Sequence, residues 1–198
     1  MKIGLTGSIA CGKSTVAAYL HSLGYAIVDA DAISRALTAP GGAALPALRD
    51  AFGSSIFTGD ALDRRALGAL VFADSTQRTR LNAILHPLIC EEIIARLNAL
   101  DAPDRIVFGD IPLLYECGLE THVDRVWVVC ASADVQLARL MARDTLSREQ
   151  ALQRIAAQMP LSEKRRRADA CIDTDHSLCE TQRQVRALLR ASWERRPS

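Results

Sequence analysis

The chain has 198 residues, of which 49% are hydrophobic and 24% charged, and its formal net charge is +1. This composition is typical of a globular protein, and the length suits one α/β core with small appendages rather than two full independent domains. The small net charge gives no general argument for a nucleic-acid or membrane partner, and no apolar run approaches transmembrane length. The first apolar run follows Met1 and Lys2 directly, so we expect no signal peptide.

The cysteines favour a reducing cytoplasm. They form no C-x-x-C pair and have no clustered histidines, so a zinc site is not expected. Several lie in apolar runs and are predicted to be small buried residues, a usage that fits a reducing compartment. The six positions are Cys11, Cys90, Cys117, Cys130, Cys171 and Cys179.

A glycine-rich loop comes first along the chain. Residues 7–14 fit the phosphate-binding pattern G-x-x-x-x-G-K-[ST], between an apolar run predicted to be a buried strand and a helical pattern that ends at Gly24. Glycines let backbone N–H groups turn toward an anion, and the helix N-terminus adds partial positive charge. The pattern predicts a nucleotide-phosphate site made of Gly7, Ser8, Ile9, Ala10, Cys11, Gly12, Lys13, Ser14 and Thr15.

Three side chains of this loop have expected roles toward ATP and Mg²⁺. Lys13 would contact the β- and γ-phosphates, and Thr15 would support the α-phosphate side. The Ser14 hydroxyl would ligate Mg²⁺, an ion that keeps several waters and bridges substrate phosphates.

Residues 25–28 are predicted to form the second strand, which ends in Asp29 and Asp31. In an open parallel sheet the ligand crevice lies outside the carboxyl ends of the strands, so both aspartates are expected near the phosphate loop. The alternative is that Asp31 caps a helix over residues 32–37.

Residues 33–100 show no strand pattern and are predicted to be an inserted helical domain that holds an acceptor. Breaks fall at Pro40-Gly41-Gly42 and Gly59-Asp60, Asp63 is predicted to be an N-cap, and Pro87 is predicted to lie in the first turn of a helix. A purely structural role is the alternative.

The third and fourth strands are predicted at residues 105–110 and 125–130. Asp110 ends the third strand, where an acid can be directed at magnesium; the alternative is an ordinary strand-end aspartate. Pro112 prevents further pairing as a central strand.

Residues 139–167 contain eight Lys and Arg and three Asp and Glu, a local charge of +5. They are predicted to form a helix-loop-helix, with one helix capped by Ser132 and another running from Ser147 to Met159. So many cations of one sign repel one another unless an anion joins them, which favours a lid that closes on triphosphate through Arg139 and Arg143. A solvated basic surface is the alternative.

Residues 170–173 are predicted to be the fifth strand, Ser177 opens the last helix, and residues 195–198 are expected to fray. The predicted fold is α/β: a doubly wound, five-stranded parallel sheet of the P-loop type with a helical insert and a helical lid. Its predicted parts are a core of residues 1–32, 101–138 and 168–198, an acceptor-binding insert of residues 33–100, and a lid of residues 139–167.

Over almost the whole chain, these motifs resemble the dephospho-coenzyme A kinase family. The residues that carry the likeness are 4–7 with 12–15, 29–31 with Arg35, 62–65 with Val71 and Phe72, 85–87, 112–114 with Glu116, Gln136, Arg139, Arg143, Asp144, Arg154, Gln158, and 168–169 before 172–173.

The resemblance implies ATP-dependent phosphorylation of the ribose 3′-hydroxyl of dephospho-coenzyme A. It implies that Asp31 is the base, that Arg143 belongs to a lid over ATP and acts with Lys13, and that Arg35, Arg65, His86 and Pro87 bind the acceptor. The expected partners are therefore small molecules, with no nucleic acid, membrane or obligate protein partner.

The chain also departs from the family pattern. Ser8 and Ala10 stand where the family usually has glycine, so the φ angles there are expected to suit residues with a Cβ. Thr174-Asp175-His176 replaces an asparagine-containing turn, which leaves the adenine contact open.

Three other functions are weighed against this one. A kinase for a nucleoside, a nucleotide or a shikimate-like acid would share the core. A GTP switch is disfavoured because no [NT]-K-x-D signature is present, and an ATP motor because Ile111, not glutamate, follows Asp110. Besides another kinase and a switch or motor, the third alternative is a protein that binds a nucleotide without catalysing a reaction.

Overall fold

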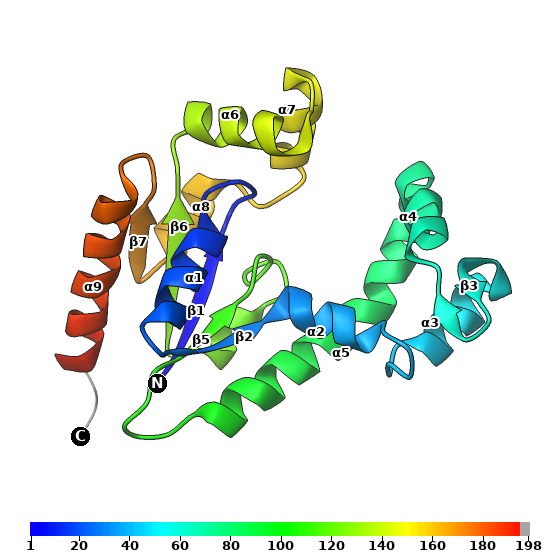
Figure 1. Ribbon diagram of the computed structural model, residues 1–198, viewed down its shortest axis with the longest axis horizontal. Helices are drawn as coiled ribbons and strands as arrows, with labels where there is room; N and C mark the ends of the chain where they lie inside the picture. The colour runs from blue at the N-terminus through cyan, green and yellow to red at the C-terminus, as the bar shows by residue number, and fades with distance from the viewer. Residues whose placement is uncertain (195–198) are drawn as a thin grey trace. The chain divides into compact units, whose positions relative to one another are not determined.

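The computed structural model describes residues 1–194 and divides into two compact units (Figure 1). The first unit contains residues 1–28 and the chain from residue 97 onward; the second contains residues 29–96. The fraying expected for residues 195–198 lies outside the described residues. The finer division into core, insert and lid stays a prediction.

A parallel five-stranded sheet with the order β2-β5-β1-β6-β7 forms the centre of the first unit (Figure 1). The central strand β1 (Lys2–Gly7) pairs with β5 (Val107–Asp110) on one side and β6 (Arg125–Cys130) on the other. At the edges lie β2 (Ala26–Asp29) and β7 (Ala170–Asp173). The five predicted strands and the fold class are confirmed.

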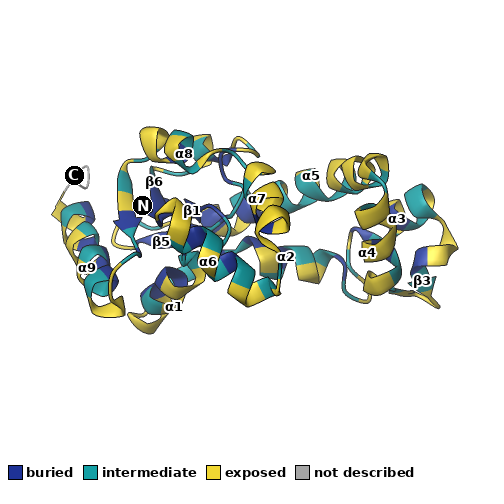
Figure 2. Cartoon of the chain, turned by 90° about the horizontal axis from the view of Figure 1, so that it is seen from above, coloured by how far each residue is buried: buried dark blue, intermediate teal, exposed yellow. Residues whose placement is uncertain are grey.

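Helices cover both faces of this sheet (Figures 1 and 2). Helices α1 (Lys13–Ser22) and α9 (Leu178–Glu194) pack on one face, and α8 (Leu161–Arg167) contacts β6. Alternate strand residues point to the same side, so the α1–α9 face collects a continuous apolar core. That core includes Ile3, Leu5, Val16, Leu20, Phe108, Trp127, Val129, Ile172, Val185 and Leu189.

The arginine-rich segment contains one helix more than expected. Helix α6 (Ala133–Asp144) packs against α7 (Arg148–Ala156), but α7 ends at Ala156 instead of Met159. The additional helix is α8, whose N-cap is Pro160. Proline ends a preceding helix but fits the start of a new one, so the predicted break is also a helix start. A short 3-10 helix, Leu119–His122, precedes β6.

The second unit is mainly helical, as predicted. Its helices are α2 (Ala30–Leu37), α3 (Leu45–Phe52), α4 (Arg64–Ala73) and most of α5 (Ser75–Leu100). The expectation that it has no strand is wrong, because β3 (Phe57–Thr58) and β4 (Ala61–Leu62) form a small antiparallel pair after the 3-10 helix Ser54–Ile56. Two residues per strand are too few to show an alternating pattern.

Two helix boundaries test the sequence reasoning in this unit. Asp63 is the N-cap of α4, as predicted, and its carboxylate accepts the N–H groups of Arg65 and Ala66 at 2.9 Å. Pro87 lies inside α5 rather than in a first turn, so that prediction is wrong. A proline removes one helical hydrogen bond, and the long apolar and helix-forming sequence on both sides keeps the helix continuous.

Within residues 1–194, no helix combines the length and the apolar character that crossing a membrane requires.

Candidate active site

The phosphate loop follows β1 directly and is shaped by two glycines. A Cβ on Gly7 would lie 2.7 Å from the carbonyl oxygen of Val129, so only glycine fits between the strands there. Gly12 has a φ of 82° and is the N-cap of α1, with no side chain capping the helix. The first N–H groups of α1, on Lys13 and Ser14, therefore lack an acceptor within the helix and lie at the positive end of its dipole.

The structure brings together the predicted lysine and the strand-end aspartate. The Lys13 ammonium donates to the Asp110 carboxylate, and the two side chains are 14% and 13% exposed. Ser14 and Thr15, in the first turn of α1, are exposed. A cation, a carboxylate and a hydroxyl are thus available beside the loop.

Ala10 corrects the expectation about the loop's backbone. Its φ is 61°, in the left-handed region that disfavours a Cβ, so the predicted φ at this position is wrong. Ser8 is not among the described residues with positive φ, so its φ suits a side chain. Ala10 therefore adopts a backbone conformation that glycine adopts without strain.

Two glutamines hold the other half of the loop. The Gln136 amide donates to the Ser8 hydroxyl and to the Ile9 carbonyl, both at 2.8 Å. The Gln158 side-chain oxygen accepts the Ile9 N–H at 2.9 Å and the Ser8 hydroxyl at 3.1 Å. Sequence reasoning quoted both glutamines for the resemblance but gave them no role, because a glutamine carries no motif chemistry of its own.

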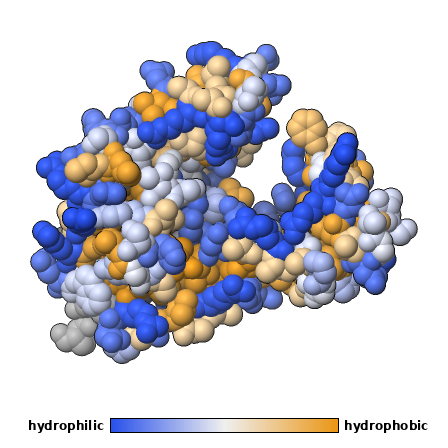
Figure 3. All heavy atoms as spheres, viewed as in Figure 1, coloured by the Kyte–Doolittle hydropathy of each residue, from blue (hydrophilic) through white to orange (hydrophobic). Residues whose placement is uncertain are grey.

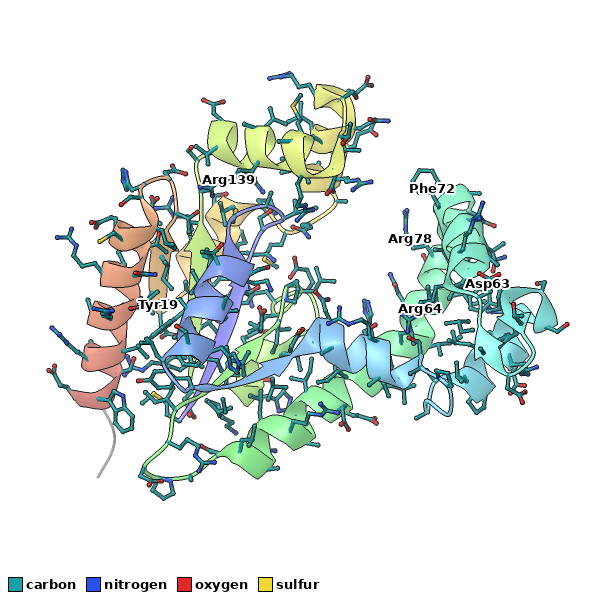
Figure 4. All side chains as sticks on the ribbon, viewed as in Figure 1. Tyr19, Asp63, Arg64, Phe72, Arg78 and Arg139 are labelled. Carbon is teal, nitrogen blue, oxygen red and sulfur yellow. The ribbon has the colours of Figure 1, made fainter. Side chains whose placement is uncertain are left out.

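A pocket of about 280 Å³ lies beside the phosphate loop. The Arg139 guanidinium donates to the Thr174 hydroxyl at 2.9 Å and to the Thr174 carbonyl at 2.6 Å, while the Thr174 hydroxyl donates to the Cys11 carbonyl at 2.9 Å. Figure 4 marks Arg139 on α6. The pocket is lined by Gly12, Thr15, Arg139, Thr174, His176, Leu178 and Thr181.

The turn after β7 also fixes the start of α6. Ser132 is the N-cap of α6 as predicted, but its side chain makes no cap bond. Instead, the Asp175 carboxylate accepts the Ser132 N–H at 2.8 and 3.0 Å, and this bond lowers the pKa of Asp175. Thr174-Asp175-His176 is therefore tied to both the phosphate loop and α6.

The charge argument for the arginine-rich segment is wrong in part. Arg143 and Arg154 both bind the Asp144 carboxylate, at 2.8 and 2.7 Å, and the Arg143 hydrogen bond holds the pKa of Asp144 below its usual value. Acids within the protein also pair with Arg166, Arg167 and Lys164. These cations do not need an external anion to offset their repulsion. Hydrophilic residues rim the surface of α6 and α7 at the top of Figure 3.

The predicted base belongs to the second unit. Asp31 lies in the first turn of α2 with an exposed side chain, and its carboxylate has no protein partner within residues 1–194. The helix is capped by Asp29, whose carboxylate accepts the N–H groups of Asp31 and Ala32 at 2.8 and 3.1 Å. The alternative that Asp31 is the cap is therefore wrong. Arg35, on the same helix, forms an exposed ion pair with Asp29 at 3.6 Å.

The remaining predicted acceptor residues lie on two helices of this unit. Arg65 is exposed on α4, and α5 carries the half-buried His86 and the exposed Pro87. No hydrogen bond or ion pair joins these three residues to one another in the described part of the chain.

Arg64 and Phe72, which sequence reasoning quoted for the resemblance but gave no role, lie on α4 with Arg78 on the neighbouring α5. Phe72 is 87% exposed, although a large aromatic side chain normally gains from burial. Figure 4 shows Arg64, Phe72 and Arg78 extending from α4 and α5 toward the same side. Arg64 is held in place by bonds to the Arg35 carbonyl at 3.2 Å and the Thr38 hydroxyl at 2.9 Å. No local signal in the sequence indicated this exposure, because Phe72 stands in an apolar stretch of α4.

Comparisons with known proteins agree with this geometry. A family model described as dephospho-CoA kinase matches residues 1–180. A curated dephospho-CoA kinase of Symbiobacterium thermophilum is 50% identical over 192 residues, covering 96% of this chain and 80% of the relative. The solved dephospho-CoA kinase of Campylobacter jejuni has a TM-score of 0.77 at 28% identity, covering 98% of both chains. Shikimate kinase from Acinetobacter baumannii, at TM-score 0.57 and 17% identity, covering 100% of this chain and 95% of that one, shares the fold.

Proposed function

The chain belongs to the dephospho-CoA kinase family, and we propose how its own residues carry out the reaction of that family. The enzyme is an ATP-dependent phosphotransferase that catalyses the final step of coenzyme A synthesis. The observation that carries the proposal is the phosphate loop, which ends at an uncapped helix next to a half-buried lysine–aspartate pair and a pocket of about 280 Å³.

ATP binds through backbone groups of the loop and side chains of the pocket. The triphosphate accepts hydrogen bonds from loop N–H groups, and the Lys13 ammonium exchanges Asp110 for the β- and γ-phosphates. The adenine enters the pocket beside Arg139 and Thr174, where a guanidinium face can stack on a planar base.

The donor set beside Lys13 fits Mg²⁺. Ser14 offers a hydroxyl and Asp110 a carboxylate, the hard oxygen ligands that this ion prefers, and one or two protein ligands suffice when phosphates and waters supply the rest. The absence of any cluster of three His, Cys, Asp or Glu suited to a metal in residues 1–194 agrees with such a ligand-sharing site. When bound with ATP, the ion neutralises phosphate charge.

Phosphoryl transfer then requires a base and a cation at the transferred group. The Asp31 carboxylate, which has no protein partner within residues 1–194, accepts the proton of the ribose 3′-hydroxyl as the oxygen attacks the γ-phosphorus, and the bond from the γ-phosphorus to the β–γ bridging oxygen breaks so that ADP leaves. Lys13 and Arg143 stabilise the charge on the transferred group. Arg143 reaches it by leaving Asp144, to which Arg154 remains bound.

The acceptor binds to the second unit. Arg35 and Arg65 supply exposed cations for its diphosphate. The half-buried His86 and the exposed Pro87, both on α5, form a further contact surface for the acceptor. Phe72 provides an exposed aromatic face for a planar or apolar part of the acceptor.

The proposed setting is a reducing cytoplasm, with ATP and dephospho-CoA as the partners and no obligate protein partner. The cysteine argument for this setting expects small buried residues, which holds for Cys11 and Cys130 but not for the exposed Cys171 and Cys179.

Substitution Asp31→Asn tests the proposed base. We expect kcat for ADP formation with dephospho-CoA to fall by about 10² to 10⁴, the usual contribution of a positioned base, with little change in KM for ATP. Asp29→Asn is the matched control, because asparagine caps a helix as well as aspartate does. An Asp31→Asn enzyme that keeps its wild-type kcat would exclude Asp31 as the base, and absence of turnover with dephospho-CoA in the wild type would contradict the function itself.

A further inference from the structure

Glutamine side chains form hydrogen bonds with both backbone polar groups of Ile9, its N–H and its carbonyl. Gln136 reaches its carbonyl and Gln158 its N–H, and the Ser8 hydroxyl lies between the two glutamines at 2.8 and 3.1 Å. Gln136 and Ser8 are 4% and 6% exposed. A buried polar network whose members are all bonded fixes a single geometry, because breaking it would leave buried groups unpaired.

The chemistry of the Ile9 peptide determines the direction of every bond. A carbonyl can only accept, so Gln136 must present its NH₂ group; an N–H can only donate, so Gln158 must present its oxygen. The Ser8 hydroxyl therefore accepts from Gln136 and donates to Gln158. A glycine at position 8 could not make this link.

One glutamine lies just before the arginine-rich segment of residues 139–167, and the other lies within it. Gln136 lies on α6, and Gln158 lies between α7 and α8. The residues after Gln158 are anchored as well. The N–H of Met159 and the fully buried Lys164 both bind Glu116, and Lys164 also donates to the Pro112 carbonyl.

We propose that Gln136, Gln158 and Ser8 are positioning residues that hold the phosphate loop ready for the triphosphate and tie the arginine-rich segment to it. The inference rests on the proposed function, because it gives these residues a role in ATP binding at that same site. A loop fixed before binding loses less conformational freedom when the phosphates arrive, so the network strengthens nucleotide binding without touching the nucleotide.

Nucleotide affinity in the folded enzyme tests the proposal. Gln136→Met and Gln158→Met keep the side-chain length and remove the hydrogen bonds. We expect each to raise the Kd for ADP, measured by titration calorimetry, about fivefold to tenfold, with KM for ATP following and KM for dephospho-CoA unchanged. Ser8→Ala should have a smaller effect, and its combination with Gln158→Met should cost less than the product of the two, because both belong to one network.

Gln184→Met is the matched control for loss of stability. The Gln184 side chain accepts the Asp173 N–H at 2.9 Å and donates to the Asp173 carbonyl at 3.0 Å, so one glutamine outside the phosphate loop makes the two kinds of bond that Gln136 and Gln158 make to Ile9. The Gln184→Met variant should lower Tm about as much as Gln136→Met and Gln158→Met do, and should leave the Kd for ADP within twofold of the wild type. A wild-type Kd in folded Gln136→Met and Gln158→Met, or an equal rise in Gln184→Met, would overturn the proposal. Because ADP binding needs no acceptor, this result is independent of whether dephospho-CoA is phosphorylated.

Discussion

In the phosphate loop, the groups offered to a ligand are backbone N–H donors, whereas in the second unit they are exposed side chains. The loop's geometry is fixed by buried neighbours, including Gln136 and Thr174. On the second unit, Asp31, Arg65 and Phe72 are exposed side chains of α2 and α4.

Substitutions in the loop and substitutions on the second unit should therefore have different effects on binding and on stability. A change in or under the loop alters the positions of several donors together, so binding and stability change with it. A change on the second unit removes one contact and leaves the helix in place, so only the constants for the acceptor should change. Each prediction below tests one side of this distinction.

The largest expected effect is at Lys13, the side chain that adds a full charge to the loop's backbone donors. Lys13→Met should lower kcat/KM by about 10³, because a preorganised cation at the transferred phosphate is lost. Steady-state ADP formation measures it, with circular dichroism to show that the fold is retained. Lys2→Met is the control, since Lys2 bonds Asn98 at 2.9 Å on the surface of the same unit. A folded Lys13→Met enzyme within threefold of the wild type would refute the loop's assigned role.

Phe72 tests the second unit. Phe72→Ala should raise KM for dephospho-CoA about tenfold, the effect of losing one stacked aromatic contact, while KM for ATP and Tm stay near wild-type values. Little stability should be lost because the ring is 87% exposed. Leu70→Ala, at a 36% exposed position of the same helix, is the matched control. Equal KM values for the acceptor in Phe72→Ala and the wild type would remove Phe72 from the acceptor site.

The third effect is on stability and concerns the loop's backbone. Ala10 has a φ of 61°, so Ala10→Gly should relieve strain and stabilise the fold by about 1 kcal/mol, raising Tm by about 2–4 °C. Ala157→Gly, at a φ of −74°, should instead destabilise, because glycine only adds freedom to the unfolded chain there. Thermal unfolding of the two variants checks the opposite signs. A lower Tm for Ala10→Gly would show that the Cβ contributes more through packing than it costs in strain.

Features of the fold and the site that have a local cause in the sequence could be predicted, and features that depend on side-chain contacts could not. The five strands and the loop were predictable because apolar runs and the spacing of Gly7, Gly12 and Lys13 have a local cause. The left-handed φ of Ala10 was not predictable, because the neighbouring Ser8 and Ile9 are held by glutamines distant in sequence. The continuity of α5 was missed because a single proline costs less than the helix-forming sequence on both sides of it contributes. The pairing of Arg143 with Asp144 was missed because counting charges ignores which charges touch.

The smallest expected effect concerns Asp144, a half-buried side chain at the end of α6 in the first unit. Its folded-state pKa is lowered by Arg143, so the stability that it adds is complete above its unfolded pKa of 3.8 and is lost as pH falls through the folded value. The difference in Tm between the wild type and Asp144→Asn should therefore be constant near pH 5 to 7 and shrink below pH 3.8. Thermal melts at pH 6, 4 and 3 measure this difference. In the Arg143→Met background it should be smaller, because only Arg154 then faces the carboxylate. A difference that does not change between pH 6 and 3 would mean that the Arg143–Asp144 pair contributes nothing to stability, and Arg143 would then leave Asp144 for a phosphate at no cost.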